Sequence, residues 1–381
     1  MNQAVITHTE ELLAFCEKEM ASPLLAIDTE FVRENTYYPK LCLIQIASAD
    51  NEAIAVDTLS DTIDLEPLKK LLTENKGLKL FHAGKQDLEI LSRLLGFVPT
   101  PMFDTQVAAQ LLGFGDQIGY EALVRDVLGK SLDKSQQYTN WSRRPLSEKQ
   151  VTYALNDVLF LREIYPVLLE RLKAKNRLSW MDELMQPLTD VDYYRSAPED
   201  AWRRLSRRSR HTSYLARLRT LSEFREIEAE QRNLPRQWIF TDDTLQELAL
   251  HPPKSAELLQ KVRLGKSAGS MTYDGLMGAI EAADPSRFDG SDLFDVPLAV
   301  TKNNETLLDL LKLAVKVIAE KENISPRLLA ASEDLIEIAM GKSVNSVLSG
   351  WRYAIAGEKI AGLLDGKYSL KITDSGKIEL V

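Results

Sequence analysis

The sequence predicts an α/β part at the N-terminus, built as a mixed sheet with flanking helices, followed by a purely helical part. Short apolar runs bounded by turn residues alternate with stretches of helical spacing up to about residue 195. Strand signals then almost vanish, and one helical segment recurs at an offset of 90 residues. At 381 residues the chain is also long for one domain, so we expect two or three domains.

Four short apolar runs in the first part are expected to form strands. They cover residues 24–27, 41–47, 53–56 and 78–81. The first three follow one another closely enough for an antiparallel meander, and the fourth comes after a stretch of helical spacing. The sheet is therefore expected to be mixed, with helices covering it.

Five stretches of the first part have helical spacing. They cover residues 65–72, 86–95, 104–112, 120–128 and 147–172. Gly96 and Gly129 directly follow two of them, and glycine commonly ends a helix. Ser147 opens the longest stretch, in which Pro166 is expected to kink or divide the helix.

The helical part contains two copies of one small module. Residues 225–250 and 315–340 align without a gap and share these identical pairs: Ala229/Ala319, Glu230/Glu320, Asn233/Asn323, Leu245/Leu335, Glu247/Glu337 and Ala249/Ala339. The shared asparagine interrupts the helical pattern at the same place in both copies, which two unrelated helices would not do. Residues 284–297, rich in proline and glycine, are expected to connect the copies.

The composition is that of an ordinary soluble globular protein, with 44% apolar and 27% charged residues. No apolar run is long enough to span a membrane, and the first residues lack the basic segment and apolar core of a signal peptide. Cys16 and Cys42 lie among apolar neighbours and are expected to be buried thiols. These features predict a cytoplasmic protein without a membrane partner.

One strip of the chain is strongly basic, although the net charge of −9 argues mildly against nucleic-acid binding. Seven arginines and no acid lie between residues 203 and 219. Within this strip Arg204, Arg207 and Arg208 are candidate nucleic-acid-binding residues. The alternative is a solvated linker or helix face.

Four acids and one tyrosine occur in settings that favour a metal centre. Asp28 and Glu30 end the first apolar run, and residues two apart in a strand face the same side. Tyr153 and Asp157 are four apart on the long predicted helix and share a face, while Asp87 begins the helix after the fourth strand. Converging carboxylates repel one another unless divalent cations neutralise them. The pattern therefore predicts paired cations of the kind that cleave phosphodiesters.

These segments resemble the three exonuclease motifs of the DEDD superfamily, in the subgroup with tyrosine in the third motif. The sister subgroup has a histidine five residues before the last acid, and no histidine lies between residues 148 and 157 here. More closely, the chain resembles the ribonuclease D family, and its two repeats resemble HRDC modules. Supporting stretches are residues 28–31, 37–41, 43–45, 103–105 and 141–147.

The resemblance implies a ribonuclease H-like fold followed by two small all-α HRDC domains, and 3′-to-5′ exonucleolysis with two divalent metal ions, Mg²⁺ or Mn²⁺. By position, the catalytic residues Asp28, Glu30, Asp87 and Asp157 would hold the metals. The catalytic Tyr153 would orient the attacking water, with help in deprotonating that water as a further implied role. It also implies an exoribonuclease that releases 5′-nucleoside monophosphates. Its RNA partners would be tRNA precursors and other small structured RNAs with free 3′ ends.

The expected division of the chain is as follows: exonuclease domain 1–195, basic linker 196–210, first HRDC domain 211–291, linker 292–300, second HRDC domain 301–367 and C-terminal tail 368–381. The tail alternates like a short hairpin around residues 374–376. Both Gly-Lys-Ser triplets, at 265–267 and 341–343, lack the earlier glycine of a phosphate-binding loop. We therefore expect no nucleotide cofactor, and we expect a monomer.

Three alternatives remain open from the sequence. A DNA exonuclease in repair or proofreading would use the same metals and chemistry, and no residue pattern here reads a 2′-hydroxyl. A catalytically decayed nucleic-acid-binding scaffold is a second alternative. The helical modules are expected to grip the substrate, with a packing or dimerisation role as the alternative. His82 is expected to be structural.

Overall fold

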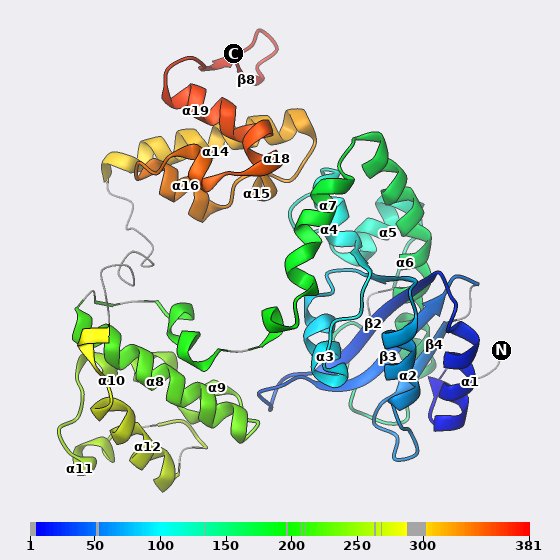
Figure 1. Ribbon diagram of the computed structural model, residues 1–381, viewed down its shortest axis with the longest axis horizontal. Helices are drawn as coiled ribbons and strands as arrows, with labels where there is room; N and C mark the ends of the chain where they lie inside the picture. The colour runs from blue at the N-terminus through cyan, green and yellow to red at the C-terminus, as the bar shows by residue number, and fades with distance from the viewer. Residues whose placement is uncertain are drawn as a thin grey trace. The chain divides into compact units, whose positions relative to one another are not determined.

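The computed structural model describes residues 5–50, 53–133, 135–195, 197–206, 208–209, 211–262, 264–267, 269–287 and 302–381. The chain forms two compact units that do not follow its order (Figure 1). Unit 1 comprises Met1–Glu30, Leu41–Tyr194 and Leu298–Val381, and unit 2 comprises Phe31–Lys40 and Arg195–Pro297. Unit 1 thus holds the sheet together with the second helical module, whereas unit 2 holds the first module.

The sheet is mixed and six-stranded, with the order β1-β4-β3-β2-β5-β6. The strands are β1 (Val5–Ile6), β2 (Leu24–Val32), β3 (Lys40–Ser48), β4 (Ala53–Asp57), β5 (Leu78–Phe81) and β6 (Met102–Asp104). β3 and β4 are antiparallel, β1 is parallel to β4, and β5 is parallel to both β2 and β6. The four predicted strands are confirmed. β1 and β6 have only two and three residues, too few to show a pattern in the sequence.

The helices that accompany the sheet include all five that the sequence predicts. They are α1 (Thr9–Glu19), α2 (Glu66–Glu74), α3 (Lys85–Leu95), α4 (Thr105–Leu111), α5 (Tyr120–Leu128), α6 (Glu148–Ala174) and α7 (Leu178–Met185), followed by the 3₁₀ helices η1 (Gln186–Thr189), η2 (Val191–Tyr194) and η3 (Pro198–Arg204). α6 packs against β4 and β5.

Of the two effects expected of Pro166, a kink or a division of the long helix, division is wrong because α6 runs through the proline. Leu161 and Leu168, one on each side of the proline, are buried in the same core. Tertiary packing supplies most of the stability of a protein helix, so burial on both sides holds α6 together across the missing N–H.

The helical part repeats one arrangement twice, as predicted. The first copy contains α8 (Thr212–Gln231), α9 (Arg236–Ile239) and α10 (Asp242–Leu250), and the second contains α14 (Lys302–Glu322), α15 (Pro326–Leu329) and α16 (Ser332–Ala339). Asn233 and Asn323 follow the long helices with positive φ, 48° and 51°. Asparagine adopts this left-handed conformation more readily than most residues, which explains why both copies keep it.

Shorter elements follow each copy. They are α11 (Ala256–Leu259), α12 (Ser270–Glu281) and η4 (Pro285–Arg287) after the first, and α17 (Val344–Val347), α18 (Gly350–Arg352), the π-helix η5 (Tyr353–Gly357) and α19 (Glu358–Leu364) after the second. An antiparallel hairpin of β7 (Leu370–Ile372) and β8 (Ile378–Leu380) follows α19, which confirms the hairpin predicted around residues 374–376. Only 284–287 of the predicted connection lie within the described residues.

The two copies belong to different hydrophobic cores. Buried side chains of α14, α15 and α16 continue the core of the sheet and its helices. At the seam, the Asn323 side chain donates to the carbonyl of Leu112 at 2.9 Å, and the rings of Trp180 and Trp351 stack 4.6 Å apart. The first copy has a core of its own, which includes Tyr37 from the loop Phe31–Lys40.

Cys16 and Cys42 are buried free thiols, as predicted. Within the described ranges, no helix combines the length and the apolar character that crossing a bilayer requires.

Candidate active site

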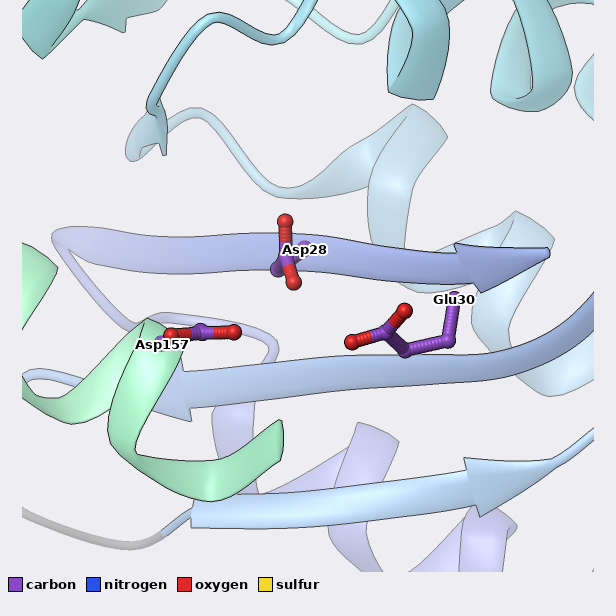
Figure 2. Close-up of side chains that lie close together, drawn as sticks. All are labelled: Asp28, Glu30 and Asp157. Atoms are coloured by element: carbon purple, nitrogen blue, oxygen red, sulfur yellow. The ribbon is translucent and has the colours of Figure 1, made fainter. Parts of the chain in front are cut away.

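Three carboxylates from two elements meet at one point of unit 1. Asp28 and Glu30 project from β2, and Asp157 projects from α6 (Figure 2). One oxygen of each carboxylate lies within 4.8 Å of an oxygen of both others. Residues that are far apart in the sequence therefore form one compact set of oxygen donors.

A clamp at the start of α6 fixes the position of Asp157. Arg144 donates to both carboxylate oxygens of Asp57, at the end of β4, and to the backbone of β3. Ser147 then opens α6 with a capping box. Because a bidentate arginine–carboxylate pair fixes geometry as well as distance, the clamp sets the first turns of α6 against the strands.

Tyr153 lies one turn before Asp157 on α6, on the same side of the helix. The ring lies beside the buried Trp141, with the ring centroids 6.1 Å apart. Burial raises the pKa of Tyr153, and the charges of the neighbouring carboxylates raise it further. The phenol therefore stays protonated at neutral pH.

Asp87 lies beside the three-carboxylate group rather than within it. It is buried in the first turn of α3 and accepts a hydrogen bond from the hydroxyl of Thr29, the residue between Asp28 and Glu30. Its charge nevertheless raises the pKa of both Asp28 and Glu30. The fourth predicted acid is thus close enough to act on the cluster.

A tight turn between β5 and α3 positions Asp87. Asp104, at the end of β6, accepts hydrogen bonds from the backbone N–H groups of Ala83 at 3.0 Å and Gly84 at 2.8 Å. Ala83 has a φ of 54°, and a Cβ on Gly84 would lie 2.6 Å from the Cβ of Phe81. The turn therefore requires glycine at 84, and Asp104 stabilises its uncommon backbone.

Burial raises the pKa of all four acids. The pKa of Glu30 rises to about 9, that of Asp157 to about 7 and that of Asp87 to about 6. The pKa of Asp28 also lies well above its ordinary value, first through burial and then through the charges of the other carboxylates. No lysine or arginine of the described chain lowers any of these values.

The donor set suits hard divalent cations. Partly buried, mutually repelling carboxylates with no positive partner are neutralised by protons or by metal ions. Mg²⁺ and Mn²⁺ prefer carboxylate oxygens, and the cluster offers no sulfur or nitrogen ligand. The geometry and the electrostatics therefore both fit the metal ions that the sequence implied.

Sequence reasoning missed three residues that shape this site. Thr29 holds Asp87 and Asp104 holds the turn before it; both lie in the motif stretches, at 28–31 and 103–105, so their positions carried a signal. Tyr120 donates its hydroxyl to the carbonyl of Asn156 at 3.1 Å. Burial raises the pKa of Tyr120, and so does the charge of Asp157. Its place at the start of α5 gave no hint of this contact.

His82 has the structural setting that we expected. Its Nδ1 lies 3.0 Å from the hydroxyl of Thr105, and its ring lies 5.3 Å from that of Tyr120. Burial lowers the pKa of His82, so the imidazole is neutral at physiological pH.

The candidate nucleic-acid-binding arginines have partners within unit 2. Arg208 pairs with two acids of α10, each at 2.6 Å, and Arg204 lies 3.3 Å from the buried Glu226. Their side chains stay 38% and 52% exposed, respectively, so both retain surface for another contact. Arg207 lies outside the described residues.

Comparisons with known proteins identify the family. A family model described as 3′-5′ exonuclease matches residues 3–173, and the HRDC domain model matches residues 215–275. The chain is 43% identical to the ribonuclease D of Zymomonas mobilis, with 99% of this chain and 97% of that protein covered. The ribonuclease D of Sphingobium indicum is 41% identical, with 99% and 98% covered. The chain belongs to the ribonuclease D family.

A solved ribonuclease D has the same fold. The crystal structure of Escherichia coli RNase D, described as an exoribonuclease involved in structured RNA processing, matches with a TM-score of 0.77 at 29% identity. The match covers 96% of this chain and 99% of that one. The predicted fold class is confirmed: a ribonuclease H-like α/β nuclease domain followed by a helical part with an HRDC domain. As a ribonuclease D with an exonuclease domain, the chain is a nuclease and therefore a hydrolase.

Proposed function

We propose that this ribonuclease D is a 3′-to-5′ exoribonuclease that hydrolyses phosphodiester bonds at RNA 3′ ends and releases 5′-nucleoside monophosphates. The observation that carries the proposal is the meeting of Asp28, Glu30 and Asp157 within 4.8 Å, with Asp87 beside them. These acids would hold two divalent ions, Mg²⁺ or Mn²⁺. Such ions, when bound, generate a nucleophile from water and stabilise the leaving oxygen.

The protein's own groups hold and orient the reactants. Asp28 and Glu30 are fixed by a central strand, and Asp157 by the clamped start of α6. Tyr153, which stays protonated, orients the attacking water through its hydroxyl. Because its pKa is raised, the phenol is a poor base, and we assign it orientation rather than proton abstraction.

RNA is the proposed substrate because the full-length relatives at 43% and 41% identity are ribonucleases. The description of the Escherichia coli protein as an enzyme of structured RNA processing supports tRNA precursors and other small structured RNAs. Hydrolysis of DNA alone would instead make the chain a repair or proofreading exonuclease, since the metal chemistry is the same. A decayed scaffold is disfavoured because all five expected site residues are present.

The remaining proposals concern organisation. We retain the division into an exonuclease domain to residue 195, HRDC domains at 211–291 and 301–367, linkers between them and a tail from 368. The second HRDC assignment is supported by the structural repeat, since the HRDC model matches only residues 215–275. We also propose a monomer that acts in the cytoplasm.

We propose further that Arg204, Arg207 and Arg208 add backbone contacts to RNA. The support is the acid-free basic strip and the partial exposure of two of the three side chains. Replacing all three by glutamine should weaken RNA binding and lower the slope of log affinity against log salt. An unchanged slope would mean that these arginines form ion pairs within the protein and do not contact RNA.

A nuclease assay on matched RNA and DNA oligonucleotides, each with a free or a blocked 3′ end, tests the central proposal. We expect release of mononucleotides from RNA with a free 3′ end, dependent on added Mg²⁺ or Mn²⁺. Cleavage of 3′-blocked RNA at the same rate, or of DNA alone, would contradict it. No cleavage of any substrate would support the scaffold.

A further inference from the structure

The equivalent faces of the two long helices have different surroundings. α8 and α14 occupy the same place in their copies, 90 residues apart, so Glu226 corresponds to Lys316 and Gln231 to Lys321. Residues at the same place in a repeated fold face the same direction relative to their own module. The two faces can therefore be compared directly.

In the first copy this face is covered from within unit 2. The hydroxyl of Tyr37, from the loop Phe31–Lys40, donates to Glu226, and Arg236 donates to the same carboxylate at 2.6 Å. The neighbouring Tyr38 donates its hydroxyl to Glu230. The Glu226 side chain is only 2% exposed. An external ligand therefore has no access to the carboxylate of Glu226.

In the second copy the equivalent face lines an open cavity of about 800 Å³ between α14, α19 and the C-terminal hairpin. Four lysines line it: Lys316 and Lys321 from α14, Lys359 from α19 and Lys377 from the hairpin. Two acids, Glu320 and Glu379, line it as well. The lysines outnumber the acids, so the cavity carries a net positive charge.

Three of these four lysines have no carboxylate partner in the part of the chain that the structure describes. Lys359 lies 3.6 Å from Glu322, which is a weak, partly exposed pair. Among the residues that the structure describes, no carboxylate lies within ion-pair distance of Lys316, Lys321 or Lys377. Three lysines that line one cavity and have no carboxylate partner among the described residues are suited to a polyanion.

An aromatic ring completes the cavity. Tyr368 lines it with 42% of its surface exposed. Its ring lies against the backbone of α19 at Gly362, where a Cβ would come within 2.4 Å of a ring carbon. A glycine at 362 is thus required to seat the tyrosine, and the backbone of Tyr368 donates to the carbonyl of the same glycine. The ring is held in place with one side available.

We propose that this cavity, which we call the lysine cavity, binds a single-stranded segment of RNA: the four lysines contact phosphates and Tyr368 stacks on a base. Proteins that bind single strands without sequence preference combine these two features, a positive groove and aromatic side chains. The proposal rests on RNA being the substrate. It gives the second module and the C-terminal hairpin a role in holding the part of the substrate that is not being cleaved.

Binding of an RNA of about 12 nucleotides, a length within the usual range for a single-strand site, tests this proposal. The 5′ end carries fluorescein, EDTA prevents cleavage, and anisotropy is measured on the full chain across a series of salt concentrations. The variants are Lys316→Glu, Lys321→Glu and both together. Lys312→Glu is the matched control, because Lys312 lies on the same helix, 51% exposed, and does not line the cavity.

We expect the double variant to bind about tenfold more weakly, with a salt slope reduced by about 1.4, which corresponds to two phosphate contacts. The control should differ little from wild type. Tyr368→Leu should also lose about tenfold, and Tyr368→Phe, which keeps the ring, should restore binding. Equal affinity and slope for the double variant and the control would overturn the proposal.

Hydrolysis of a dinucleotide separates this proposal from the proposed function. A dinucleotide is short enough to occupy the active site alone and does not need the lysine cavity. The lysine variants should therefore cleave it at the wild-type rate. A slower rate in the double variant would mean a damaged fold or active site and would overturn the assignment. A different result would separate the two proposals in the other direction. If the wild-type chain cleaved no RNA, but the double variant bound RNA more weakly than wild type and the control did not, the lysine cavity would stand and the proposed function would fail.

Discussion

Two regions of this protein bury carboxylates in opposite ways. In the first helical module, burial by itself raises the pKa of Glu226, yet hydrogen bonds from Arg236 and Tyr37 and the arginine charges outweigh it and hold the value at about 2. In the active site, burial and mutual repulsion raise the pKa of Glu30 to about 9. Positive and hydrogen-bonding groups of the chain compensate the charge of Glu226, whereas no such groups compensate the charge of Glu30.

The difference teaches how to distinguish a structural acid from a functional one. A structural acid keeps its charge because arginine and tyrosine are placed around it. The active-site acids are held together at a cost to the metal-free fold, which is common where a site awaits a ligand of opposite charge. The same residue type therefore has opposite effects on stability in the two regions, and mutations should separate them.

The largest effect is expected from Asp28→Asn. Removing one metal-binding carboxylate should lower exonuclease activity by about a thousandfold or more. The metal-free fold should be as stable as wild type or more stable, because one source of repulsion is gone. Activity on RNA and urea unfolding in EDTA measure the two quantities. If Asp28→Asn lost activity only because its fold was less stable, the contrast between the active-site acids and Glu226 would be wrong.

Arg236→Met should have the reverse profile. It leaves the buried Glu226 with fewer partners, so the free energy of unfolding should fall by about 3 kcal/mol. Arg232→Met removes a partly exposed pair with Glu228 and should cost less than about 1 kcal/mol. Urea unfolding measures both. Equal losses in the two variants would show that Glu226 is not held by a compensated network.

Tyr153→Phe sharpens the assignment within the site. The phenol is not one of the carboxylate donors, so metal affinity should change little. Turnover should fall by about ten- to a hundredfold, since the water loses an orienting group. The rate at saturating substrate and metal affinity are measured separately. A large loss of metal affinity with normal turnover would contradict the proposed role.

Metal-free stability should also depend on pH in a way that separates the two regions. Unfolded acids titrate at about pH 4, whereas the folded pKa of Asp157 is about 7 and that of Glu30 about 9. Between these limits the folded state binds more protons, so metal-free stability should fall as pH rises from about 4 to about 9. Mg²⁺ should raise the melting temperature more at pH 8 than at pH 6. An equal rise at both values would argue against proton-linked binding.

Much of the fold was predictable because its signals are local. Apolar runs marked four strands, and the repeat at 90 residues appeared in the structure as the same three helices with the same left-handed asparagine. Strands of two or three residues carry no such signal. The two same-face pairs of the active site were also predictable, because strand and helix periodicities place Asp28 with Glu30 and Tyr153 with Asp157. The convergence of these pairs with Asp87 was implied by the family resemblance.

What could not be predicted depends on contacts between distant residues. Nothing local shows that Arg144 reaches Asp57, or that Thr29 holds Asp87. The grouping of the loop Phe31–Lys40 with the first module likewise depends on tertiary contacts. Such contacts depend on the finished fold, so residue patterns alone do not reveal them.

Calorimetric titration of metal-free protein with Mn²⁺ tests the central claim most directly, namely that the uncompensated acids are held together for divalent cations. We predict saturable binding to the wild-type chain that is lost in Asp28→Asn. It should be kept in Glu170→Gln, which removes an exposed acid from α6. No saturable binding to wild type, or unchanged binding in Asp28→Asn, would contradict the account.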